Sequence, residues 1–143
     1  MKTILTISLF LTLTYPFKTF SQTELDSRII EFYGQIEVKK LTDTRISYLN
    51  YYLDNSYEIM EISRQKDEKF TLLSELLLES KTDNKYILDK NINNINILKY
   101  SIKRSSKLRT TYRLDNTNKV LVFYSNEEFT NNYNTYLKDI KND

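Results

Sequence analysis

The alternation of apolar and polar positions is clearest from residue 108 onward, where it predicts a β-hairpin. Apolar and aromatic residues alternate with Arg and Thr over residues 108–114, as on a half-buried strand. Residues 115–118 read Asp-Asn-Thr-Asn, a sequence typical of a tight turn. Residues 119–124 are apolar on both faces, which predicts a strand in the interior of a sheet.

The hairpin is followed by a predicted helix. Ser125 and Glu128 have the spacing of a capping box, in which a serine and a glutamate satisfy the first backbone donors of a helix. One face of this helix then carries apolar and aromatic residues at helical spacing: Phe129, Tyr133, Tyr136, Leu137 and Ile140. We expect this helix to cover one face of the sheet.

The region before residue 56 predicts two helices. The first has an apolar stripe from Leu25 to Tyr33 and ends at Gly34, the residue type preferred just after a helix. The second begins after Thr42 or Asp43, and its apolar residues share one face. Residues 35–40 fit either a strand or the start of another helix.

The middle of the chain is less regular. Residues 57–62 predict a strand, with a continued helix as the alternative, and residues 70–77 carry a helical stripe. The polar residues 81–96 predict a loop with one helical turn, and residues 97–102 alternate like another strand. The resulting fold class is α+β: N-terminal helices, then a mostly antiparallel sheet with a C-terminal β-hairpin followed by a packing helix.

Residues 1–22 have the features of a secretory signal peptide. A basic start precedes an apolar run over residues 4–13, and Thr19 and Ser21 are the small residues expected before a cleavage site. A retained anchor is the alternative, but the run is shorter than the roughly 20 residues that span a bilayer. We therefore expect residues 23–143 to form a single domain of a bacterial protein exported to the periplasm or the medium, with no stable membrane span after cleavage.

Removal of this leader changes the charge of the protein. The chain has 21 basic and 19 acidic residues, and the leader holds Lys2, Lys18 and no acid. The mature chain is therefore neutral overall, which argues against a nucleic acid as partner. An exported chain without cysteine also has no disulfide bonds.

The absence of histidine and cysteine from the chain excludes several classes of enzyme. Neither Ser-His-Asp nor Cys-His catalysis is available, and the usual zinc ligands are missing. We expect no metal and no cofactor. Chemistry based on paired carboxylates remains open, and three pairs are near in sequence: Asp54 and Glu58, Glu75 and Glu79, and Glu127 and Glu128. Each pair also fits a solvated face or the start of a helix.

A basic run without acids lies between Ile97 and Leu114. If strands over residues 97–103 and 108–114 paired, the sheet would present basic residues that could bind a phosphate, a sulfated sugar or an acidic peptide. The candidate anion-binding residues are Lys99, Lys103, Arg109 and Arg113. The alternative is a solvated face whose lysines and arginines protect a sheet edge.

Tyrosine is abundant, with 12 residues in the chain. Tyr48, Tyr51, Tyr52 and Tyr57 cluster and could stack on sugar rings or anchor a partner, or they could line the rim of the core. We expect a non-catalytic binding or interaction module with an envelope or extracellular partner. The alternative function is a carboxylate-dependent hydrolase that acts on an envelope or extracellular polymer.

Overall fold

The computed structural model describes residues 24–63, 69–81 and 84–142. The signal peptide expected over residues 1–22 lies outside these ranges and stays a prediction. Within the described ranges, no helix has both the length and the apolar character needed to cross a membrane.

Two short helices open the domain, and nearby residues determine where the first of them begins and ends. Helix α1 (Ser27–Tyr33) begins after Asp26, whose side chain accepts a hydrogen bond from the backbone N–H of Arg28. It ends at Gly34, which has a φ of 80° that favours glycine. Helix α2 (Gln35–Val38) follows at once, so the helical alternative holds for this segment.

Helix α3 (Asp43–Asn55) matches the predicted second helix. The hydroxyl of Thr42 accepts a hydrogen bond from the backbone N–H of Arg45, which confirms the predicted cap. Leu49 and Leu53 are the residues of this helix that are buried. The chain then leaves the helix directly into the first strand.

The sheet has four strands in the order β1-β4-β3-β2. Strand β4 (Lys119–Phe123) is central and pairs antiparallel with both β1 (Tyr57–Glu61) and β3 (Thr110–Arg113). Strand β2 (Thr71–Leu72) pairs in parallel with β3. The α+β class and the hairpin are confirmed, but the sheet is mixed rather than mostly antiparallel.

In the described part of the segment between β2 and β3, the chain forms three 3₁₀ helices. Helix η1 (Leu73–Leu76) replaces the α-helix predicted over residues 70–77, because the chain first pairs with β3 and only then turns. Helix η2 (Ile92–Asn94) is the helical turn expected in the polar stretch.

The strand predicted over residues 97–102 is wrong. Helix η3 (Ile97–Lys99) forms there instead, because the side chain of Asn96 accepts a hydrogen bond from the backbone N–H of Leu98 and starts a turn. The basic run therefore does not form a two-stranded face.

One hydrophobic core joins the helices to the sheet. Its members come from α1, α3, the 3₁₀ segments and both central strands, and those that are fully buried include Ile29, Leu53, Leu73, Ile95, Leu121 and Phe123. The core thus depends on residues spread over nearly the whole described chain.

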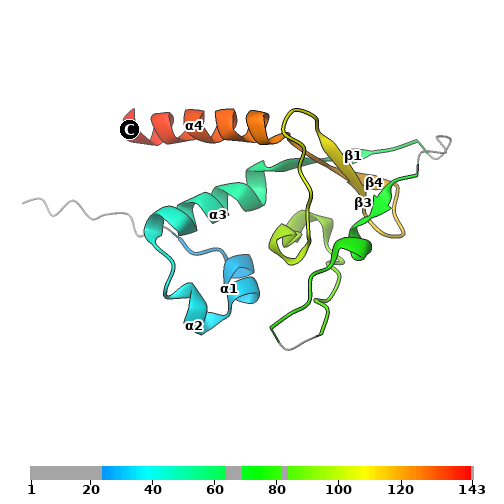
Figure 1. Cartoon of the computed structure of the whole chain (residues 1–143), viewed down its shortest axis with the longest axis horizontal. Coiled ribbons are helices and arrows are strands. Elements are labelled where there is room, and N and C mark those ends of the chain that lie inside the picture. The colour runs from blue at the N-terminus through cyan, green and yellow to red at the C-terminus, as the bar shows by residue number, and fades with distance from the viewer. Residues whose placement is uncertain (1–23, 64–68, 82–83, 143) are drawn as a thin grey trace, which may run out of the picture.

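The last helix, α4 (Asn126–Asn142), runs beside α3 and away from the sheet (Figure 1). Its aromatic residues contact three tyrosines of α3 in an aromatic seam made of Tyr48, Tyr51, Tyr52, Phe129, Tyr133 and Tyr136. The expectation that this helix covers the sheet is therefore wrong. Helix α4 packs against α3 instead, through the aromatic rings that both helices carry.

Candidate anion-binding site

The turn between β3 and β4 is held by hydrogen bonds within its own few residues. The backbone N–H of Thr117 donates to the carbonyl of Leu114 at 3.2 Å, and the Thr117 hydroxyl donates to the same oxygen at 2.8 Å. Asn116 adopts a left-handed conformation with a φ of 57°, which asparagine tolerates better than most residues. Arg113 donates from Nε to the carbonyl of Thr117 at 3.0 Å. The turn is therefore a preformed structure.

The one acidic residue of this turn points elsewhere. Asp115 accepts hydrogen bonds from both the backbone N–H and the hydroxyl of Ser74 in η1. This contact ties the turn to the neighbouring 3₁₀ helix. It also removes the carboxylate from the surface that the turn presents.

A hollow of about 830 Å³ lies against the turn. We call it the turn pocket, and the residues that line it are Ile62, Ser63, Lys90, Ile92, Arg113, Leu114, Asn116, Thr117, Asn118 and Lys119. Its size is within the range of ligand sites in proteins. The lining combines three cations with two asparagine side chains and contains no carboxylate.

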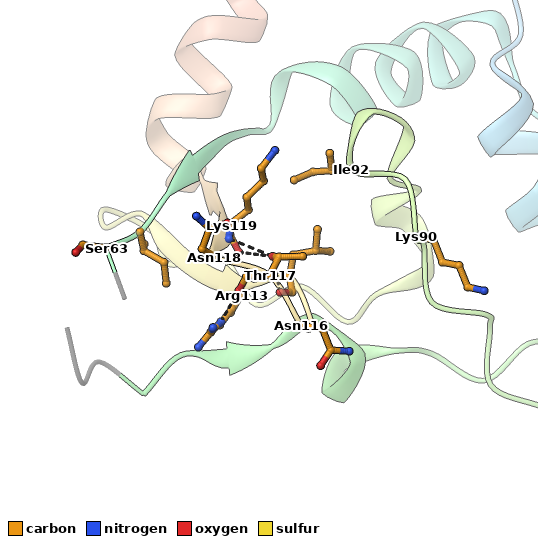
Figure 2. A pocket seen from close by; sticks show the side chains of 10 residues that line it. Ser63, Lys90, Ile92, Arg113, Asn116, Thr117, Asn118 and Lys119 are labelled. Carbon is orange, nitrogen blue, oxygen red and sulfur yellow. Dashed lines mark hydrogen bonds between the residues drawn. The ribbon is translucent and has the colours of Figure 1, made fainter. Parts of the chain in front are cut away.

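The three cations approach the turn from different sides. Figure 2 shows that the charged ends of Lys90, Arg113 and Lys119 point in different directions around the turn. Glu61 is the cross-strand neighbour of Lys119, but in the part of the chain that the structure describes none of these three cations forms an ion pair with a carboxylate. Within the described residues, their positive charges are therefore not offset by an ion pair.

Lys99, one of the predicted site residues, is buried and has internal partners. Its Nζ contacts Oε1 of Glu31 at 3.1 Å and Oδ1 of Asp89 at 2.7 Å, and it donates to the carbonyl of Ile87 at 3.2 Å. Burial lowers the pKa of Lys99, but the hydrogen bonds to Asp89 and Glu31 outweigh burial and raise it overall. This ammonium group holds the 3₁₀ segment to α1.

Arg109, a second predicted residue, lies on the surface between two carboxylates. It contacts Glu58 of β1 and Glu128 of α4, each at 2.5 Å. The hydrogen bond from Arg109 lowers the pKa of Glu128. Glu128 therefore faces the arginine, and only the serine half of the predicted capping box forms, through the hydrogen bond from the Glu128 N–H to Ser125 Oγ at 3.1 Å.

The structure thus brings one of the four predicted residues, Arg113, to the turn pocket. Lys103 is exposed on the irregular segment before β3, where its backbone exchanges hydrogen bonds with the hydroxyl of Tyr112. Sequence analysis missed Lys90 and Lys119 as site residues. Lys119 follows the predicted turn directly and could have been found there, whereas Lys90 comes from a distant polar loop that gave no signal.

Half of the carboxylates considered for catalysis are bound to arginines: Asp54 by Arg28, and Glu58 and Glu128 by Arg109. Arg28 contacts both Asp26 and Asp54 at 2.6 Å, and these two line a second hollow of about 520 Å³ together with Glu24. The hydrogen bond from Arg28 lowers the pKa of Asp26. A general acid in glycoside hydrolysis needs a raised pKa, so Asp26 has the opposite tuning.

The predicted tyrosine cluster is divided between two places. Tyr48, Tyr51 and Tyr52 belong to the aromatic seam, while Tyr57 packs against Phe123 in the core with ring centroids 5.3 Å apart. All four tyrosine rings therefore pack against other aromatic rings of the protein. Among the described residues, no group of three or more His, Cys, Asp or Glu side chains is arranged to hold a metal ion.

Comparison with known proteins gives no relative of this chain. No family model, no curated protein and no solved structure matches it. Any inference about function therefore depends on the geometry of the turn pocket and on charge.

Proposed function

We propose that this protein is a small exported bacterial binding module that recognises an extended anionic polymer at the turn pocket. The observation that carries the proposal is the lining of the pocket, where three cations that form no ion pair with a carboxylate of the described chain surround a preformed turn. The amide groups of Asn116 and Asn118 add hydrogen-bond donors beside these charges.

The direction of the cations favours an extended ligand over a compact one. In this arrangement the charged ends of Lys90, Arg113 and Lys119 diverge (Figure 2), so a single phosphate would contact all three only after their side chains rearranged. A polymer with charges at intervals can follow the surface from one cation to the next. Acidic polysaccharides of an envelope or of the extracellular medium have this chemistry and fit an exported protein.

The neutral charge of the mature chain makes this attraction local. At physiological salt, screening acts over about 8 Å, so only a ligand docked on the turn feels the three cations strongly. Binding should therefore weaken steeply as salt is raised. Specificity would come from the spacing of the cations around the turn.

The test compares two double variants that remove the same charge. Lys90→Gln with Lys119→Gln removes two cations from the pocket, while Lys103→Gln with Lys107→Gln removes two exposed cations from the basic run outside it. Calorimetric titration with a sulfated oligosaccharide, an oligo-uronate and inorganic phosphate should show binding of an oligosaccharide but not of phosphate. The pocket variant should bind about tenfold more weakly, a change of about 1.4 kcal/mol.

The control variant should bind like the wild type. Equal losses in the two variants would place the interaction on the basic run in general and contradict a site at the turn. Absence of binding to both oligosaccharides at low salt would reject the proposed function.

The proposed export has a separate test. Protein recovered from the envelope or the medium of expressing cells should have an intact mass that lacks the first 21 or 22 residues. A mass that includes Met1 would contradict the signal peptide and favour the retained anchor.

The carboxylate-dependent hydrolase is the second hypothesis, and the second hollow is where it would act. Asp26 and Asp54 lie there, but both are bound by Arg28. Incubation with the same oligosaccharides and chromatography of the products tests this alternative, because a binding module leaves their length unchanged.

A further inference from the structure

Strand β1 is an edge strand whose outer side has no neighbour in the described chain. The sheet order ends at β1, and the bridges outside the named strands join other residues. β1 has five residues and is longer than β2, which forms the opposite edge with two. Ile59 is 40% exposed and Met60 is 50% exposed, so this edge also presents apolar side chains.

The hydrogen bonds to β4 define which backbone groups point outward. The N–H of Ile62 donates to the carbonyl of Asn118, and the N–H of Tyr124 donates to the carbonyl of Ser56. In an antiparallel pair such residues alternate along the strand. Residues 58 and 60 therefore also face β4, and the N–H and C=O groups of Tyr57, Ile59 and Glu61 point away from the sheet.

We propose that β1 pairs antiparallel with β1 of a second copy of this chain, with Ile59 on the two-fold axis. The outward groups of Ile59 then meet those of Ile59 in the other copy, and those of Tyr57 meet those of Glu61. Each outward N–H faces an outward C=O in this register. The two four-stranded sheets become one continuous sheet.

The side chains of β1 suit a second copy in the same register. Ile59 lies opposite its own copy, Met60 lies opposite Glu58, and Tyr57 lies opposite Glu61, so no like charges oppose each other directly. Glu58 is also neutralised by Arg109 of its own chain. The centre of β1 is apolar, so no charged side chain of the kind that commonly prevents edge pairing stands on the two-fold axis.

The contact is small, because it consists mainly of two five-residue strands. Interfaces of limited area are weak and transient. The dimer should therefore form with rising concentration and should dissociate on dilution. Sedimentation velocity from micromolar to millimolar concentration measures this directly.

The first experiment uses two matched variants. Ile59→Lys places two like charges on the two-fold axis, whereas Ile36→Lys makes the same change at a residue of α2 that is 76% exposed and lies outside β1. The wild type and Ile36→Lys should shift from monomer toward twice that mass as concentration rises, and Ile59→Lys should stay monomeric. Circular dichroism confirms that each variant is folded.

The second experiment locates the contact without a charge change. The chain has no cysteine, so Ile59→Cys and Ile36→Cys each provide one site for a nitroxide spin label. Paired residues on hydrogen-bonded antiparallel strands have Cα atoms about 5.5 Å apart, so the label at position 59 should show strong dipolar broadening that the label at position 36 does not. A wild type that stays monomeric at millimolar concentration, or a dimer without broadening at position 59, would overturn the proposal.

Discussion

At the scale of single residues, the cations of this protein fall into two groups. Arg28, Lys99 and Arg109 are each held between two carboxylates from different parts of the chain. Within the described residues, the cations of the turn pocket form no such ion pairs. The first group links distant parts of the fold, and the second group is the one that we propose binds a ligand.

Replacement of Lys99 by methionine should destabilise the protein. The substitution keeps a long apolar side chain but leaves the largely buried carboxylate of Asp89 without its cation. We expect a loss of about 3 kcal/mol in the free energy of unfolding, at the lower end of the range for a broken buried pair because Glu31 is half exposed. Urea unfolding measures the loss.

Lys40→Met is the control for this substitution. Glu37 lies in α2, and Lys40 follows the end of this helix. The two residues form an ion pair in which both side chains are exposed. The unfolding midpoint of Lys40→Met should match that of the wild type, since exposed ion pairs contribute little to the free energy of unfolding. Equal effects at both positions would contradict a structural role for Lys99.

The roles of residues could be predicted from the sequence where they depend on residues nearby in the chain. The caps formed by Thr42 and Ser125 and the turn that contains Asn116 depend on residues within a few positions, and all three are present. The burial of Lys99 could not be predicted in this way. It depends on Glu31, which is 68 positions away.

At the scale of elements, β4 is the strand on which the sheet depends. It pairs on both sides, and its residue Leu121 is fully buried while Val122 is partly exposed. The continuous apolar run of this strand made its central position predictable. The pairing of β2 was not predictable, because two residues carry no pattern and the choice of partner is made by distant residues.

Truncation of residues in β4 should have graded effects. Leu121→Ala leaves a cavity in the core and should cost about 2–5 kcal/mol, whereas Val122→Ala should cost about 1 kcal/mol because the site is partly open. Urea unfolding ranks the two variants. A larger loss for Val122→Ala would mean that its face of the sheet is the buried one.

The start of α4 allows a second test at this scale. Ser125→Ala removes the oxygen that accepts from the Glu128 N–H, and this should cost about 1 kcal/mol. Thr135→Ala alters an exposed threonine within the same helix and should not lower stability, since alanine is the better helix former. The difference between their unfolding midpoints reports the cap.

At the scale of the whole molecule, the absence of histidine and cysteine shapes the response to pH. Asp26 has a lowered pKa in the folded state because Arg28 donates hydrogen bonds to it. Its contribution to stability is present above its ordinary pKa of 3.8 and is lost as pH falls through the lowered value. Burial raises the pKa of Tyr100, whose contribution is present below its ordinary pKa of 10.0 and is lost as pH rises above it.

The free energy of unfolding should therefore be nearly constant between about pH 5 and about pH 9, since no side chain has an ordinary pKa in that window. It should fall below and above these limits. Urea midpoints measured at intervals across this range test the expectation. A change of the midpoint between pH 6 and pH 8 would contradict it.

The position of β4 has a consequence for how the protein is made. A chain emerges from the ribosome from its N-terminus, and β1 finds its ladder partner only when residues 119–123 have been synthesised. Closing such long loops is slow compared with forming local turns. The nascent chain therefore lacks its sheet, and the core built on that sheet, until most of its residues have been synthesised.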